Sequence, residues 1–173
     1  FSEASVQALL LDLFDDSGAD EDFDQVALGL GPIYDVMVGA QKETFAFTTI
    51  FSFVAALKDA EPDASEAIDT LTAYNGVLGA PVADAFGTGE TNDGGHASNL
   101  PVYASLDDGP VTTALVGDPL FNTLGQIRYF RFVGDGAEHT VSLETSDEMD
   151  PDVYVYRQGV LVTSMATFSG NEV

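Results

Sequence analysis

The sequence predicts an α+β fold in two parts, a helical subdomain followed by an antiparallel β-sandwich of jelly-roll type. Apolar residues recur at helical spacing in the first half of the chain and alternate as in strands in the second half. The stretch between the halves is rich in Gly, Ala, Asn and Asp, which is typical of a linker. We therefore expect a helical subdomain at residues 1–76, a linker at 77–99 and a sandwich at 100–173.

Four or five helices are expected in the first half. Ser2 is a favourable N-cap for the first helix, and Pro32 suits the first turn of another. Asp63 and Glu66 have the spacing of a capping box and predict the start of the last helix. The segments with helical apolar spacing are residues 2–14, 25–30, 32–38, 47–57 and 63–74.

The second half carries short alternating strands separated by Gly and Asp turns, which is the pattern of an antiparallel sandwich. The strand segments are residues 129–133, 141–143, 153–156 and 160–165. A sandwich that stopped at residue 173 would leave one edge unpaired and one core face uncovered. We therefore expect the sandwich to be incomplete at its C-terminal end and the chain to be a piece of a longer protein.

The overall composition excludes several classes of function. The chain has 5 basic and 29 acidic residues, a net charge of −24, which repels nucleic-acid backbones and disfavours docking on anionic lipid. No run approaches the ~20 apolar residues of a membrane span. Because there is no Cys, the chain has no thiolate nucleophile, disulfide or cysteine-based metal site.

Residues 100–173 resemble the pre-peptidase C-terminal (PPC) domain, an accessory β-sandwich found behind the catalytic domains of many secreted bacterial proteases. The resemblance implies a non-catalytic sandwich that serves adhesion, secretion or processing. In that family further strands follow the last matching segment. The matching segments occur in order: SLDDG at 105–109, RYFRF at 128–132, TVSL at 140–143, DPDVYVY at 150–156 and SGNE at 169–172.

The first half resembles the helical C-terminal part of secreted bacterial proteins related to gluzincin zinc metallopeptidases. The segments that carry this resemblance are FSEASVQ at 1–7, LDLFD at 11–15, GPIYDV at 31–36 and FTTIFSF at 47–53. In those proteins the zinc-binding HExxH helix lies upstream of this region, so the resemblance implies that zinc belongs to a part outside this chain. The two histidines, His96 and His139, do not lie in an HExxH frame.

Two acidic clusters are candidate calcium sites, because Ca²⁺ takes several oxygen ligands from flexible loops. The first candidate ligand set is Asp147, Glu148, Asp150 and Asp152, in a turn between two expected strands. The second and weaker set, in the loop around Gly18, is Asp16, Asp20, Asp22 and Asp24. Neither has the spacing of an EF-hand, and simple hydration of the carboxylates explains both clusters as well.

Tyr129, Tyr154 and Tyr156 are candidates for an outward aromatic surface that binds a polymer, and packing between sheets explains them equally well. No motif assembles a catalytic triad, since His96 lies in the linker and His139 precedes a strand. A pair of carboxylates acting as in glycosidases stays open as the weakest alternative, because so many acids always include some suitable pair.

These observations predict a non-catalytic C-terminal segment of a secreted metallopeptidase-like protein, inactive by itself. Its expected partners are the upstream catalytic domain of the same polypeptide and a protein or polymer substrate. Its expected location is extracellular, periplasmic or at the cell surface. The alternative function is a calcium-stabilised module that binds extracellular matrix or another polymer.

Overall fold

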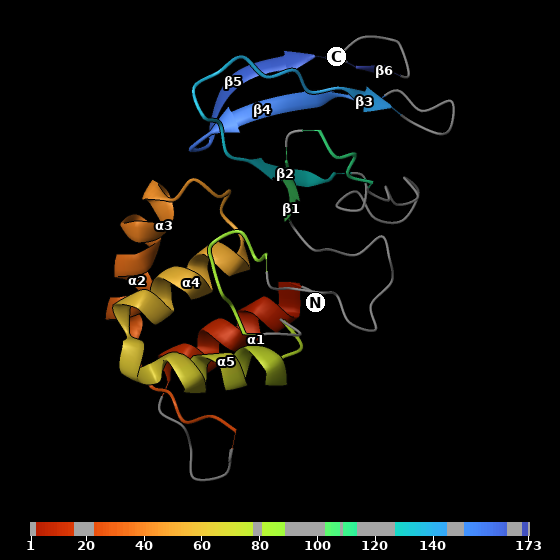
Figure 1. Ribbon diagram of the computed structural model, residues 1–173. Coiled ribbons are helices and arrows are strands. Elements are labelled where there is room, and N and C mark those ends of the chain that lie inside the picture. Colours follow the sequence, from red (N-terminus) through yellow and green to blue (C-terminus); the bar gives the residue numbers. More distant parts are fainter. Residues whose placement is uncertain are drawn as a thin grey trace. The chain divides into compact units, whose positions relative to one another are not determined.

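The computed structural model shows helices followed by strands in small sheets (Figure 1), which confirms the mixed α+β class. The chain divides into two compact units, Phe1–Phe132 and Val133–Val173. Within the described residues the strands form three two-stranded sheets, so a closed sandwich stays a prediction. The structure describes residues 3–15, 23–77, 81–88, 103–107, 109–113, 127–144, 151–165 and 171–172.

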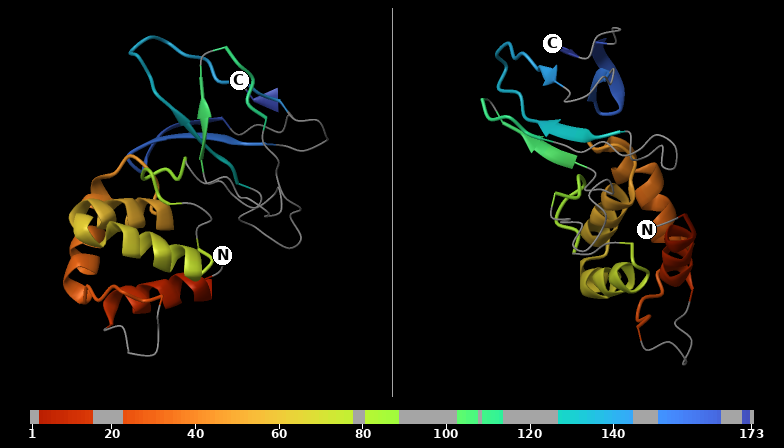
Figure 2. Two further views of the ribbon diagram at one scale, coloured as in Figure 1. Left: turned by 60° about the horizontal axis from the view of Figure 1, so that its bottom comes forward. Right: turned by 90° about the vertical axis from the view of Figure 1, so that its right-hand side faces the viewer.

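The first unit contains a cluster of short helices. α1 packs against α5, and α4 contacts α2, α3 and α5 (Figure 2). The helices are α1 Glu3–Phe14, α2 Leu30–Val38, α3 Ala40–Glu43, α4 Ile50–Ala60, the 3₁₀-helix η1 Pro62–Ala64 and α5 Ser65–Tyr74.

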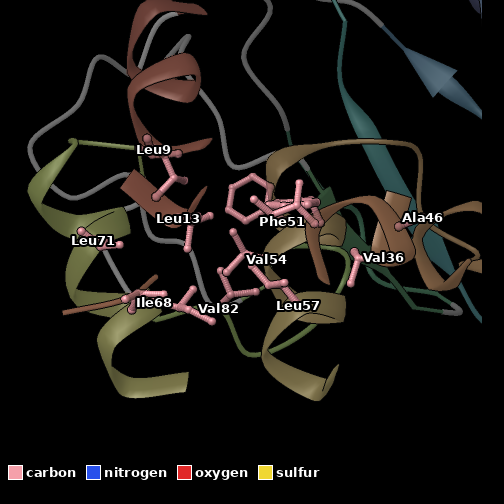
Figure 3. Packing of buried hydrophobic residues seen from close by; sticks show 14 of the residues in the cluster. Leu9, Leu13, Val36, Ala46, Phe51, Val54, Leu57, Ile68, Leu71 and Val82 are labelled. Atoms are coloured by element: carbon pink, nitrogen blue, oxygen red, sulfur yellow. The ribbon is translucent and has the colours of Figure 1, made fainter. Parts of the chain in front are cut away.

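The apolar stripes that predicted the helices form one core, to which α1, α4 and α5 contribute most (Figure 3). Burial of these side chains is the main force that holds the short helices together, since helices of this length are marginal alone. The apolar side chains with at most 1% exposure are Leu9 and Leu13 of α1, Phe51, Val54 and Leu57 of α4, and Ile68 and Leu71 of α5.

The predicted helix at residues 25–30 is wrong, because residues 24–29 are not helical. The Asp24 carboxylate accepts a hydrogen bond from the Val26 amide at 3.1 Å, which favours a turn over a helix. The amide of Leu28 then donates to the last turn of α1, at the Leu13 carbonyl. Gly29, at φ 69°, ends the segment before α2 begins.

The predicted capping box at Asp63 and Glu66 is also wrong. η1 leads into α5, whose N-cap Ala64 makes no side-chain capping bond. The capping box of this unit lies at α4, where the Thr49 side chain accepts from the Ser52 amide and the Ser52 hydroxyl accepts from the Thr49 amide. Ser at the third helical position replaces the usual Glu or Gln, so the sequence pattern did not reveal this box.

Two strands belong to the same compact unit as the helices. β1 Tyr103–Leu106 and β2 Tyr129–Phe132 pair in parallel, with Tyr103 opposite Tyr129. This pair differs from the antiparallel arrangement expected for all the strands. Tyr103 is 6% exposed and packs in the helical core. The unit therefore extends beyond the linker at which the sequence suggested a domain boundary.

The second unit is built from antiparallel pairs. β3 Leu143–Glu144 pairs with β6 Asn171–Glu172, and β4 Val153–Arg157 pairs with β5 Val160–Met165. The β4–β5 hairpin turns at Gln158 and Gly159, both of which have positive φ (49° and 71°). Two successive positive φ values are typical of the tight turns whose twist matches that of the flanking strands.

Candidate functional site

The stronger predicted calcium cluster is only partly within the described residues. Asp147, Glu148 and Asp150 lie outside them. Asp152 is described, and its carboxylate accepts a long hydrogen bond of 3.4 Å from the Tyr154 hydroxyl. Calcium binding by this cluster therefore stays a prediction. For Asp152 the structure identifies one neighbour, the Tyr154 hydroxyl.

The weaker predicted cluster is described at one position. Asp16, Asp20 and Asp22 lie outside the described residues, whereas Asp24 is 3% exposed. The buried Asp24 carboxylate already serves the turn after α1 by accepting the Val26 amide. Calcium binding here also stays a prediction. In the described ranges of the chain, no three His, Asp or Glu side chains come together as a metal-binding group.

Of the two histidines, only His139 falls within the described residues. Its Nε2 atom lies 2.8 Å from the Asp135 carboxylate, four positions earlier in the loop before β3. The backbone amide of Ala137 and the His139 side chain lower the pKa of Asp135 by hydrogen bonding to its ionised form. These contacts stabilise the loop conformation on the unit's surface.

The three candidate tyrosines differ in how far they are buried. Tyr129 of β2 is partly buried, and its ring packs against Phe47 and Tyr103 at centroid distances of 5.3 and 5.5 Å. Tyr154 and Tyr156 of β4 are 51% and 43% exposed. Packing therefore explains Tyr129, while Tyr154 and Tyr156 expose about half of their surface to solvent.

Tyr154 and Tyr156 share one face of the β4–β5 hairpin, because side chains two residues apart on a strand point the same way. Leu161 of β5 pairs with Tyr156 across the hairpin and is 49% exposed. We call Tyr154, Tyr156 and Leu161 the tyrosine face. Leu161 was not foreseen as a site residue, because its place opposite Tyr156 depends on a register shift between Val155 and Tyr156.

The opposite face of the hairpin is mostly aliphatic, with Arg157 near its turn. Val153 pairs with Met165, and Val155 with Thr163. Val155 and Met165 are 39% and 40% exposed. All six residues of β5 are exposed, and within residues 133–144 and 151–165 of the second unit no side chain is buried. A two-stranded hairpin with both faces in water is marginally stable, so covering either face would stabilise this unit.

The electrostatics of the tyrosine face favour a neutral phenol. The negative charge of Asp152 raises the pKa of Tyr154, and partial desolvation adds to this. Tyr154 therefore keeps its hydroxyl proton well into the alkaline range, and donates it to the Asp152 carboxylate. The arrangement offers two flat apolar rings with hydroxyl groups at their ends.

No protein-family model, curated protein or solved structure matches this chain. Of the helices in the described ranges, none combines the length and hydropathy that crossing a bilayer requires.

Proposed function

We propose that this chain is a non-catalytic segment of a secreted metallopeptidase-like protein and that its second unit binds a protein or polymer substrate through the tyrosine face. The observation that carries the proposal is the exposure of both faces of the β4–β5 hairpin, with Tyr154, Tyr156 and Leu161 gathered on one of them. The sequence resemblance to secreted proteases supplies the expected context.

The two faces of the hairpin have different chemistry, which supports different roles for them. In a β-sandwich each sheet buries one face against the other sheet and leaves one outside. The aliphatic side chains of Val153, Val155 and Met165 suit the inner face. The tyrosine face then points outward, where phenol rings supply large contact area at low conformational-entropy cost.

A binding unit tethered to a protease raises the local concentration of the substrate that it holds. Such a unit needs only moderate affinity, because the tether converts the second encounter into an intramolecular one. A small exposed face with two aromatic anchors is consistent with this moderate affinity. The chain's net charge of −24 directs the proposal towards neutral or basic polymers.

The test is cosedimentation of the purified chain with insoluble collagen fibres and with insoluble chitin. We expect retention by at least one polymer and a loss of about tenfold in affinity, or about 1.4 kcal/mol, when Tyr154→Ser and Tyr156→Ser are combined. The matched control is Val160→Ser, which alters a side chain 67% exposed near the hairpin turn. No binding to either polymer, or equal binding by the double variant, would contradict the proposal.

The non-catalytic part of the proposal is tested separately. The purified chain is incubated with casein and with fluorogenic peptides, and no cleavage above the buffer rate is expected. Cleavage that copurifies with the chain and survives inhibitors of common contaminating proteases would refute it.

A further inference from the structure

The turn that ends helix α5 contains Asn75 followed by Gly76. Asparagine is a chemically labile residue, and the step that consumes it is attack by the backbone nitrogen of the next residue. Glycine has no Cβ atom, so its nitrogen approaches the preceding side chain with little steric hindrance. Asn75 is the only one of the five asparagines in the sequence that precedes a glycine. Asn75 is partly exposed and Gly76 is exposed, so water has access to this turn.

The reaction available to this pair is deamidation through a cyclic imide. The Gly76 nitrogen gives up its proton and attacks the Asn75 Cγ atom. A new C–N bond forms and the Cγ–Nδ2 bond breaks, so the side-chain nitrogen leaves as ammonia and takes up that proton. Water then adds across one of the two C–N bonds of the imide, which leaves either aspartate or its β-linked isomer. Water is the only co-reactant, and no atom is oxidised or reduced.

The fold holds Asn75 and Gly76 away from this reaction. The Asn75 Nδ2 atom donates to the Asp12 carboxylate at 2.8 Å and to the Leu71 carbonyl at 3.1 Å, which fixes the side chain. The Gly76 amide donates to the Ala73 carbonyl at 3.1 Å, which disfavours the loss of its proton. Ring closure requires the Gly76 nitrogen to eclipse the Asn75 Cβ atom, but at ψ 1° it eclipses the Asn75 nitrogen instead.

The residues on either side keep this turn in place. The Tyr74 ring stacks on the Phe23 ring, with 3.4 Å between the ring centroids. Val77 is 2% exposed, and its amide donates to the Thr72 carbonyl at 3.0 Å. The reaction therefore requires the end of α5 to open. Local opening of a helix end is much less costly than unfolding of the whole unit.

Deamidation would also change the contact between α1 and α5. It replaces the amide that donates to Asp12 of α1 by a carboxylate, so two negative charges would lie at hydrogen-bond distance from each other. The new charge would lie at the C-terminal end of α5, where the helix dipole disfavours an anion. Both effects weaken the attachment of α5 to α1.

We propose that Asn75 and Gly76 form a deamidation site that the packing of α1 against α5 keeps closed, and that modification of this site in turn loosens the packing. Because the ammonia is lost, the change is one-way and marks each chain whose α5 terminus has opened. This inference is independent of the polymer binding proposed above.

The first test measures the rate of deamidation at Asn75 in the full chain at mildly alkaline pH, by mass analysis of its peptides. We expect the folded chain to react about tenfold or more slowly than the chain in concentrated urea, because only the open fraction reacts. Asp12→Ala removes the acceptor of the side-chain hydrogen bond and should speed the reaction of the folded chain about fivefold.

The matched control is Asp15→Ala, which removes an exposed acid just after the same helix and should change the rate by less than about twofold. In urea all three chains should react alike, because Asp12 and Asp15 are far from Asn75 in sequence. Equal rates for the folded and unfolded chains would overturn the proposal. Equal effects of the two variants on the folded chain would also overturn it.

The second test concerns the effect of the modification on α1 and α5. Asn75→Asp supplies the charge of the product and should lower the melting temperature, followed by far-UV circular dichroism, by about 2–4 °C. Combining it with Asp12→Asn restores one amide facing one carboxylate, so the double variant should recover most of this shift. A double variant that melts no higher than Asn75→Asp alone would refute the proposed loosening.

Discussion

At the scale of single residues, Tyr103 joins β1 to the helices through one hydrogen bond. Its hydroxyl accepts from the Phe47 amide at 2.8 Å, just before α4, and its ring is 6% exposed. Tyr103→Phe leaves this amide without its partner, so we expect a loss of about 1–3 kcal/mol in the free energy of unfolding, measured by urea titration at neutral pH. Tyr34→Phe, at a 58% exposed position, is the control and should change stability by less than about 0.5 kcal/mol.

The same residue predicts how stability depends on alkaline pH. Burial raises the pKa of Tyr103 from 10.0, and the hydrogen bond from Phe47 opposes this only in part. Because the folded pKa exceeds the unfolded one, this contribution to stability is complete below about pH 10 and falls as the pH rises through the folded pKa. Urea titrations on both sides of this range should therefore show a smaller alkaline loss for Tyr103→Phe than for the unchanged chain. Equal losses would show that Tyr103 does not titrate in this way.

Gly87 is required by both its backbone angle and its surroundings. Its φ is 67°, and a Cβ atom there would lie 2.5 Å from the Phe51 ring. The turn is held in place by Asp84, whose carboxylate accepts the Phe86 amide at 2.8 Å. We expect Gly87→Ala to lower the free energy of unfolding by about 2 kcal/mol or more, because the positive φ strains an alanine and the added Cβ atom overpacks against Phe51.

Gly76→Ala separates these two effects. Gly76 has a similar φ of 61° but nothing within 4 Å of the added Cβ. Thermal melting should therefore show a smaller loss for Gly76→Ala than for Gly87→Ala. Equal losses would mean that Phe51 moves aside without cost.

At the scale of elements, one ion pair connects α4, α5 and the segment after them. Lys58 Nζ lies 2.6 Å from the Asp69 carboxylate and 3.1 Å from the Val82 carbonyl, and the two side chains are only 14% and 19% exposed. Asp69 Oδ1 is buried and has no hydrogen-bond partner within the described part of the chain. Lys58→Met therefore leaves a largely buried carboxylate uncompensated, and we expect it to cost about 1–3 kcal/mol in urea unfolding.

Adding Asp69→Leu to this variant removes the uncompensated charge. The double variant should recover most of the lost stability, because a buried pair can be replaced by apolar packing at little cost. A double variant less stable than Lys58→Met alone would contradict this explanation. It would show that the isolated Asp69 charge is not the cause of the loss and that the ion pair itself stabilises this region.

The elements that sequence predicts best are those whose signal is local. The stripe through Leu9 and Leu13 in α1 and the positions of the two strands expected at 153–156 and 160–165 both match the structure closely. Residues 25–30 were assigned to a helix because their apolar spacing is helical. In the structure the amide of Val26 donates to the Asp24 side chain, and the amides of Leu28 and Gly29 donate to carbonyls of α1, so these amides make no helical hydrogen bonds. The parallel pairing of β1 with β2 joins segments far apart in the chain, which no local pattern encodes.

In the candidate site, too, local sequence patterns identify some features and contacts between distant residues decide the others. For Tyr129, Tyr154 and Tyr156 alike, residue type and alternation left an outward surface and packing between sheets equally open. Only the tertiary contacts of Tyr129 with Phe47 and Tyr103 reveal it as a packing residue. Leu161 joins the tyrosine face through cross-strand register, which depends on the turn and on the shift near Val155.

At the scale of the whole molecule, the extent of the first folding unit is testable by truncation. The strands attach to the helical core through rings: Phe86 meets Tyr103 edge-on at 5.2 Å, and the Arg131 guanidinium lies 4.5 Å from the Phe86 ring centre. A chain of residues 1–132 keeps all of these contacts, and we expect it to melt cooperatively with a near-UV circular dichroism signal from its buried aromatic rings.

A chain of residues 1–99 should instead melt broadly or remain loosely packed, because it lacks Tyr103 and leaves the Phe47 amide and the Phe86 ring without their partners. Residues 133–173 alone should be largely unfolded, since their described side chains form no buried core. Cooperative melting of residues 1–99 at the temperature of residues 1–132 would contradict this and would favour the boundary within 77–99. Loss of structure in the shorter chain would instead establish that two strands distant in sequence complete the helical unit.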